Sequence, residues 1–521
     1  MRLRKKIFVE ILTFSYACDT IIKIKKAPLN KALLKHTGGN MSKKLVYDIH
    51  DKPQPSKLIV FAVQQLLAII AATIAVPAMV GNGMSASAAL FGAGVGTLVY
   101  QLFTKFRSPV FLGSSFAFIS SMSAAFAGAA SMSLGYLGLL LGALFCGLVY
   151  VILAAVVKFV GVEWINKLMP PVVIGPTVAL IGLSLAGPAV KDMFSYGPQL
   201  DGGAFVMSTN IWLSLICALV TLTVVVLCST YGKKMIKLIP FIIGILSGYV
   251  VALIFTAIGY AADVDAMKVI DFAPFKNLVA DGVKFTTFLS LPEFSFIKAI
   301  DGVKDFEWSY LTTVAVAYIP VAFVVFAEHI ADHKNLSSII EEDLLENPGL
   351  HRTLLGDGVG SIAGAFFGGC PNTTYGESVG CVAITRNASV ITITATAILA
   401  ILISFLSPFV AFLDSIPGCI MGGVCITLYG FIAVSGLKML QKVNLEDNAN
   451  LFTVSVILIT GIGGMAMAIG KVVITAVACA LILGIIVNTI LTKFKKEEAA
   501  EPTVEETTEE VTEEAAPLDN E

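Results

Sequence analysis

Residues 134–157 read LGYLGLLLGALFCGLVYVILAAVV and contain no charged side chain. A helix needs about 20 apolar residues to cross the hydrocarbon core of a bilayer, so this stretch predicts a membrane-spanning helix. Runs of similar length and composition recur from Leu58 to Leu491, and 56% of the 521 residues are hydrophobic while 14% are charged. The chain is therefore predicted to be an all-α polytopic membrane protein.

The apolar runs divide into two sets. Runs bounded by charges, Gly or Pro predict about 14 crossings, and the polar stretch from Asp263 to Glu307 separates them into two sets of about seven. An odd number in each half requires the halves to enter the membrane in opposite directions, which predicts an inverted repeat. The predicted starts are Leu58, Ala86, Val110, Leu134, Pro171, Ile211 and Ile239 in the first half, and Leu311, Leu354, Gly376, Ala388, Pro417, Leu451 and Val472 in the second.

The division into two sets predicts the bounds of each repeat and the side of the membrane on which the connecting segments lie. We predict a first seven-span repeat at 57–262, an extracytoplasmic linker at 263–310 and a second repeat at 311–496. Short translocated loops exclude Lys and Arg, and the basic residues fit best with both termini in the cytoplasm. Residues 1–56 are then a cytoplasmic segment, and the acidic residues 497–521 are a disordered cytoplasmic tail. We also predict that translation starts at Met41, so that 1–40 would be an upstream extension.

Two polar stretches interrupt the apolar pattern at the third position of each half. They are SPVFLGSSFAF at 108–118 and GGCPNTTYGESVG at 368–380. Irregular backbone at membrane depth is tolerated only where it is buried in protein or lines a water-filled cavity. The two stretches therefore predict broken helices that face a substrate cavity, and polar loops at the membrane surface are the alternative.

Carboxylates lie close to these breaks. Glu377 belongs to the second break, and Glu328 belongs to the apolar run VVFAEHIADH at 324–333. A carboxylate inside an apolar run is costly unless it is paired, protonated or facing water, so it marks a functional site. Glu328 and Asp332 are four residues apart and share one helical face, which predicts a proton-coupling pair. A helix end at the cytoplasmic interface is the alternative for Glu328.

Aromatic side chains in the breaks and amide side chains in the first span indicate what the cavity could bind and how the helices are held together. Phe116 and Tyr375 place one aromatic ring in each break, where a flat heteroaromatic substrate would stack, although packing is the commoner role of such rings. Gln64 and Gln65 are predicted to hydrogen-bond across helices.

The nine cysteines are scattered without metal-binding spacing, and the sequence contains no P-loop, GxSxG or HExxH motif. We therefore predict no metal, no cofactor, no nucleic-acid partner and no enzymatic activity.

The sequence resembles the nucleobase-ascorbate transporters, also called nucleobase:cation symporters, and among them the uracil branch. The resemblance covers about Lys57 to Lys496. It is carried by QQLLA at 64–68, AATIAVP at 71–77, LGSSFAFI at 112–119, AEHI at 327–330 and PNTTYGE at 371–377, followed by AITR at 383–386.

The resemblance implies a function and a site. The implied function is uptake of uracil with protons across the cytoplasmic (inner) membrane, by a homodimer with core and gate domains and with short strands in spans three and ten. Glutamates at the positions of Glu328 and Glu377 would bind the pyrimidine edge, and Glu328 would couple binding to the proton. The substrate-binding residues that it implies are Ala72, Phe116, Glu328, Tyr375, Gly376 and Glu377.

Two positions depart from the family pattern. Asp332 stands where some uracil permeases have a histidine, with His333 adjacent, and Ser378 stands where the family signature usually has asparagine. Two alternatives stay open: a xanthine or urate symporter of the same family, and an anion transporter or channel of the same architecture. The second is less favoured because carboxylates at the breaks would repel an anion.

Overall fold

The computed structural model describes residues 45–498 except 162, 163, 165, 166, 168, 202, 234, 281, 442, 470 and 471. The description below concerns the described residues from Val46 onward. The predicted start at Met41, the predicted upstream extension at 1–40 and nearly all of the predicted acidic tail lie outside the described residues.

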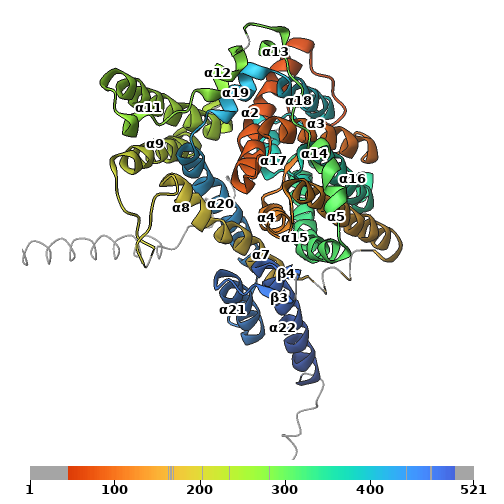
Figure 1. The fold of residues 1–521 in the computed structure, drawn as a ribbon. Helices are drawn as coiled ribbons and strands as arrows, with labels where there is room; N and C mark the ends of the chain where they lie inside the picture. The colour runs from red at the N-terminus through yellow and green to blue at the C-terminus, as the bar shows by residue number, and fades with distance from the viewer. Residues whose placement is uncertain are drawn as a thin grey trace, which may run out of the picture. The chain divides into compact units, whose positions relative to one another are not determined.

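Helices make up most of the first half (Figure 1). They are α2 (Pro55–Val80), α3 (Ala86–Phe103), α4 (Ile119–Ala127), α5 (Met132–Val160), α7 (Pro171–Ser184), α8 (Ala186–Met193), α9 (Thr209–Tyr231), α10 (Met235–Leu238) and α11 (Pro240–Ala262). The predicted linker contains only short helices in its described part, namely α12 (Ala273–Val279), α13 (Phe285–Phe288) and α14 (Ser295–Ala299) together with two 3-10 turns.

The second half is built in the same way. Its helices are α15 (Trp308–Ile340), α16 (Leu350–Gly368), α17 (Gly376–Thr385), α18 (Val390–Ser404), α19 (Ser407–Asp414), α20 (Gly418–Leu440), α21 (Asn448–Ile462) and α22 (Ala476–Glu498). It also contains the strands β2 (Asn372–Thr374), β3 (Met467–Ile469) and β4 (Val472–Ile474), while β1 (Leu112–Ser114) lies in the first half.

Capping side chains and prolines set where several helices begin. The Ser85 side chain caps α3 by accepting a hydrogen bond from the backbone N–H of Ala88, and Ser131 caps α5 in the same way. Helices α2, α7 and α11 begin with proline, whose missing N–H would have no partner in the first turn anyway. Local chemistry at the ends of the apolar runs therefore fixes the helix boundaries.

Nine helical segments within the described ranges are long and apolar enough to cross a membrane. The other predicted crossings contain shorter or less apolar helices, namely α4, α16, α17, α18 and α21. The prediction of a multi-pass helical protein is confirmed, whereas the layout of 14 crossings in two inverted repeats stays a prediction.

The short strands join the two halves. Strand β1 pairs with β2 in an antiparallel ladder, with Leu112 opposite Thr374 and Ser114 opposite Asn372. This confirms the strands that the resemblance implied in the third and tenth segments. A second antiparallel pair, β3 with β4, was not predicted, and β4 occupies the start of the last predicted crossing.

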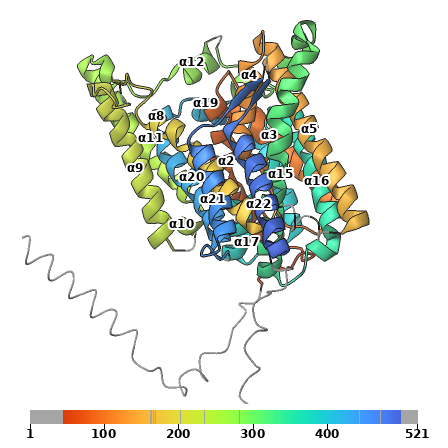
Figure 2. The same ribbon diagram turned by 90° about the horizontal axis from the view of Figure 1, so that it is seen from below.

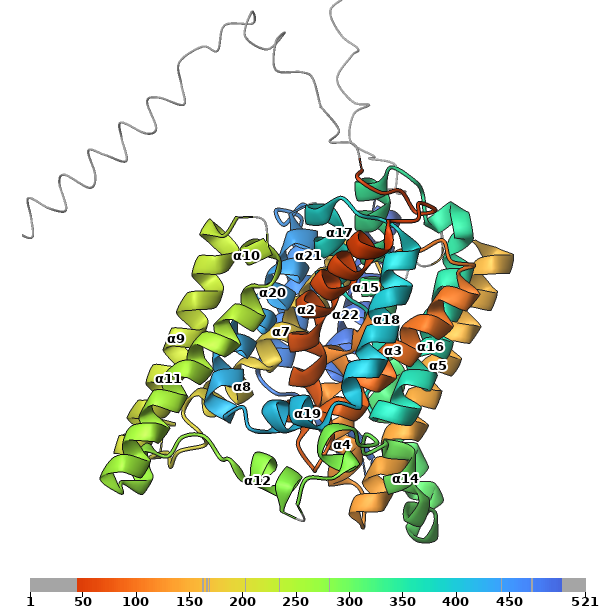
Figure 3. The same ribbon diagram turned by 90° about the horizontal axis from the view of Figure 1, so that it is seen from above.

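The helices pack in two groups. Helices α2, α3, α4, α5, α15, α16, α17 and α18 pack against one another, and α7, α8, α9, α11, α20, α21 and α22 form the other group. Figures 2 and 3 both show α9 and α11 on one side and α5 and α16 on the opposite side, with α2 and α15 between them. A Cβ atom at Gly92 or Gly96 of α3 would collide with the α16 backbone, so glycine allows these two helices to pack closely.

Candidate functional site

A cavity of about 410 Å³ lies between the two helix groups. Helices α2, α15 and α17 line it from one group, while α7 and α20 line it from the other, together with α10 and the start of α11. A second cavity of about 50 Å³ shares Glu328, Gly376, Glu377 and Ile432 with the first, so the two adjoin. This smaller cavity lies where β1 and β2 end and their following helices begin.

The β1–β2 ladder positions the first turn of α17. Beyond the paired strands, the backbone N–H of Tyr375 donates to Phe111 O at 3.1 Å, and that of Ser115 donates to Pro371 O at 2.9 Å. The Tyr375 hydroxyl donates to Ser114 O at 2.8 Å, which holds its ring against Gly113. A side chain at Gly113 would collide with this ring, so the strand requires glycine there.

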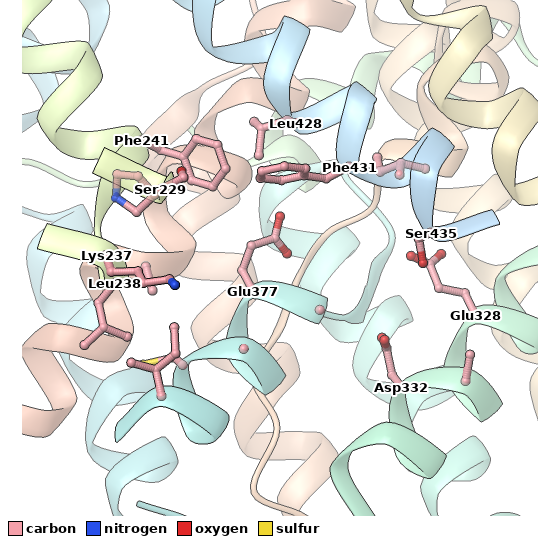
Figure 4. A pocket seen from close by; sticks show the side chains of 18 of the residues that line it. Ser229, Lys237, Leu238, Phe241, Glu328, Asp332, Glu377, Leu428, Phe431 and Ser435 are labelled. Carbon is pink, nitrogen blue, oxygen red and sulfur yellow. The ribbon is translucent and has the colours of Figure 1, made fainter. Parts of the chain in front are cut away.

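Three carboxylates reach the larger cavity. Glu328 and Asp332 extend from α15 one turn apart, and Glu377 extends from α17 (Figure 4). All three are half-buried. The Thr374 hydroxyl donates to Asp332 Oδ2 at 2.9 Å, which connects the end of β2 to α15. Glu328 and Asp332 therefore share one face of α15, as predicted, and this face lines the larger cavity.

Ser378, the departure from the family signature, holds α17 in place. Its buried Oγ accepts hydrogen bonds from Gln65 Nε2 at 2.5 Å and from the backbone N–H of Phe111 at 3.0 Å. Gln64 Nε2 donates to the Met235 sulfur at 2.8 Å. Both glutamines thus hydrogen-bond to other helices, as predicted, and a serine is sufficient to join α2, α17 and the segment before β1.

The structure brings most of the predicted site residues together. The smaller cavity is lined by Phe116, Glu328, Tyr375, Gly376 and Glu377. Asp332 lines the larger cavity, whereas Ala72 is fully buried in α2 and lines neither.

The two aromatic rings have different surroundings. The Phe116 ring contacts Tyr429 of α20 edge-on, with ring centroids 5.6 Å apart, while the Tyr375 ring lies over β1. Both side chains are nearly buried, and a small part of each reaches the smaller cavity. A flat ligand entering that cavity would therefore meet rings that are already held in place.

The histidines beside the carboxylates face away from the cavity. His329 Nδ1 is hydrogen-bonded to Asp357 Oδ2 at 2.8 Å and its Nε2 to Thr353 Oγ1 at 3.0 Å. His333 Nδ1 donates to His329 O, and its Nε2 lies 2.7 Å from the Tyr100 hydroxyl. These contacts fix α15 against α3 and α16, and so fix the direction in which its carboxylates point.

Several residues of the larger cavity were not predicted from the sequence. Lys237 of α10, Phe241 of α11, and Phe431 and Ser435 of α20 all line it (Figure 4). In the sequence, Lys237 is one of many basic residues assigned to cytoplasmic loops, and the phenylalanines are indistinguishable from packing residues. Only the packing of distant helices brings them to the site.

A cavity between two helix groups with half-buried carboxylates around it, in a multi-pass helical protein, is typical of membrane transporters. A family profile described as "Permease family" matches residues 56–470. The chain belongs to this permease family, so it is a transporter and not an enzyme, and the resemblance to nucleobase transporters is confirmed.

Curated relatives cover most of this chain. It is 38% identical over 468 residues to a uracil permease of Bacillus subtilis (strain 168), covering 88% of this chain and 98% of the relative. It is 39% identical over 451 residues to a uracil permease of Bacillus caldolyticus, covering 86% and 95%. It is 34% identical over 439 residues to a uracil permease of Escherichia coli (strain K12), covering 84% and 92%.

Solved structures share the fold at low sequence identity. The transmembrane domain of a cyanobacterial bicarbonate transporter, BicA, superposes with a TM-score of 0.56 at 14% identity, covering 85% of this chain and 100% of that chain. A structure of SLC26A9 gives the same TM-score at 12% identity, covering 85% and 66%. At this level of identity the likeness concerns the fold alone.

Proposed function

We propose that this protein carries uracil into the cell together with protons across the cytoplasmic membrane. The observation that supports this most directly is that Glu328 of α15 and Glu377 of α17 reach one site, beside the rings of Phe116 and Tyr375. The uracil permeases to which the chain is 34–39% identical point to the same substrate.

The chemistry of uracil fits these groups. Its ring carries two N–H donors and two carbonyl acceptors on its edge, and carboxylates are strong acceptors for the N–H groups. The backbone N–H groups in the first turn of α17, beginning with Gly376, have no intrahelical partner and are donors for a carbonyl. The flat faces of the ring suit the apolar walls of the smaller cavity, which Phe116 and Tyr375 partly form.

Proton coupling is assigned to Glu328 and Asp332. Their carboxylates and that of Glu377 line one cavity, so a proton bound by any of them relieves repulsion between like charges. Glu328 is the better candidate because it lines both cavities and lies next to the proposed ring site. Asp332 already accepts a hydrogen bond from Thr374, so it is assigned a supporting role.

The same proposal extends to the architecture. We assign 14 crossings in two repeats at 57–262 and 311–496, with both termini in the cytoplasm and an extracytoplasmic linker at 263–310. The antiparallel β1–β2 pair supports this, because the strands occupy corresponding places in the two halves. We assign the group containing α15 and α17 to a core domain and the group containing α20 to a gate domain of a homodimer.

Uptake of radiolabelled uracil tests the proposal. The protein is expressed in cells that lack their own uracil permease, and uptake is measured with and without a protonophore and with excess unlabelled xanthine. Uptake that the protonophore abolishes and xanthine leaves unchanged is the expected result. Absence of uracil uptake, with xanthine or urate carried instead, would refute the uracil assignment and leave the family assignment unchanged.

A further inference from the structure

We propose that Lys237 is the counter-ion of the empty site: its ammonium neutralises a site carboxylate after substrate and proton have left, and so permits the unloaded carrier to return. The inference rests on the proposed function, because it assigns a step in the same transport cycle. It concerns a residue that lies outside the substrate-binding set.

Lys237 lies on a short helix at the edge of the larger cavity. Helix α10 has four residues and connects α9 to α11, and Lys237 lines the larger cavity from it. Among the described residues that line this cavity, Lys237 is the one basic residue, and it shares the cavity with three carboxylates. In Figure 4, Lys237 and Glu377 extend into the cavity from different walls.

The positive charge of Lys237 can offset the negative charge of the carboxylates in the cavity. When uracil and the proton leave, the carboxylates of Glu328, Asp332 and Glu377 remain in a half-buried cavity. Unpaired negative charge is costly to move through the low-dielectric part of a membrane protein, whereas a paired carboxylate is much less costly. Lysine suits this role because its ammonium lies at the end of a long flexible chain.

The location of α10 makes the pairing dependent on conformation. Glu377 belongs to the helix group that contains α2 and α15, and α10 connects two helices of the other group. The Met235 sulfur of α10 accepts a hydrogen bond from Gln64 of α2, so α10 lies at the boundary between the groups. Movement of one group against the other therefore changes the separation of Lys237 and Glu377, and their ion pair forms in part of the cycle only.

The test compares net uptake with exchange. In exchange, labelled uracil outside replaces unlabelled uracil inside, so the carrier never crosses the membrane empty, whereas net uptake requires the empty carrier to return. We expect Lys237→Gln to lower net uracil uptake roughly tenfold, the effect of one ion pair of moderate strength, while exchange stays within about twofold of wild type. Lys237→Arg, which keeps the charge, should restore net uptake.

The matched control is Lys233→Gln, because Lys233 is an exposed lysine of the same connection that does not line the cavity. Its net uptake and exchange should both equal those of wild type, at equal protein levels in the membrane. Two results would overturn the inference: Lys237→Gln lowers net uptake and exchange in parallel, or it lowers neither. Absence of both net uracil uptake and uracil exchange in the wild-type protein would instead refute the proposed function, and the inference with it.

Discussion

Replacement of Ser378 by alanine tests how the site is held. The Ser378 Oγ accepts one hydrogen bond from Gln65 and one from the backbone N–H of Phe111, and all three groups are buried. An alanine leaves both donors without this acceptor. A buried donor without a partner costs about 1–3 kcal/mol, so Ser378→Ala is expected to lower the free energy of unfolding by about 2–6 kcal/mol.

The same substitution should weaken substrate binding. Ser378 follows Glu377 directly in the first turns of α17, so loosening it displaces the carboxylate and the backbone N–H groups that we assign to uracil. A loss of about 1.4 kcal/mol raises the Kd for uracil tenfold, and we expect at least that change. Ser378→Asn supplies a side-chain carbonyl as an acceptor and should recover most of the loss.

Purified protein allows both quantities to be measured. Labelled uracil binding gives the Kd, and a thermal-shift assay in detergent gives the change in stability. Ser455→Ala is the control, because Ser455 is an exposed serine of α21 that lines neither cavity. Wild-type affinity and wild-type thermal stability in Ser378→Ala would refute the reasoning, since they would mean that Gln65 and Phe111 find other partners at no cost.

Three further predictions concern the site itself. Glu328→Gln cannot exchange a proton, so cells should take up uracil only to equilibrium, and accumulation above the external concentration would contradict its coupling role. Glu377→Ala removes an acceptor of the ring N–H groups and should raise the Kd roughly tenfold or more in a binding assay; unchanged affinity would remove it from the site. Gly113→Ala places a methyl group against the Tyr375 ring and should lower uracil uptake and thermal stability together, and wild-type values of both would contradict the close packing.

The sequence predicts the parts of this protein that depend on local pattern. The uncharged run at 134–157 lies within α5, and the spacing of Glu328 and Asp332 places them on one face of α15. The Gly- and Ser-rich breaks at 108–118 and 368–380 contain β1 and β2, because both lack the continuous apolar run of a spanning helix. Each of these features is encoded within about one helix length of chain.

Other features depend on packing and could not be predicted in this way. His329 and His333 follow the two carboxylates by one residue, which turns them by about 100° around the helix and into the buried contacts with Asp357 and Tyr100. Lys237 reaches the cavity only because α10 lies beside α2 and α17. Strand β4 replaces the first residues of an expected helix, and its apolar residues suit either structure.

The ladder between β1 and β2 joins two distant parts of the chain, and each of them leads directly into residues that line the proposed binding site. Phe116 follows one strand and Glu377 follows the other, so the cavity wall that contains Phe116 and the wall that contains Glu377 are joined by the backbone hydrogen bonds of one ladder. Whatever displacement changes access to the site, these two walls travel as one body. A displacement of one helix group against the other therefore leaves the relation between these two walls unchanged and alters their distance from Ile181 of α7 and Ile432 of α20, which also line the smaller cavity.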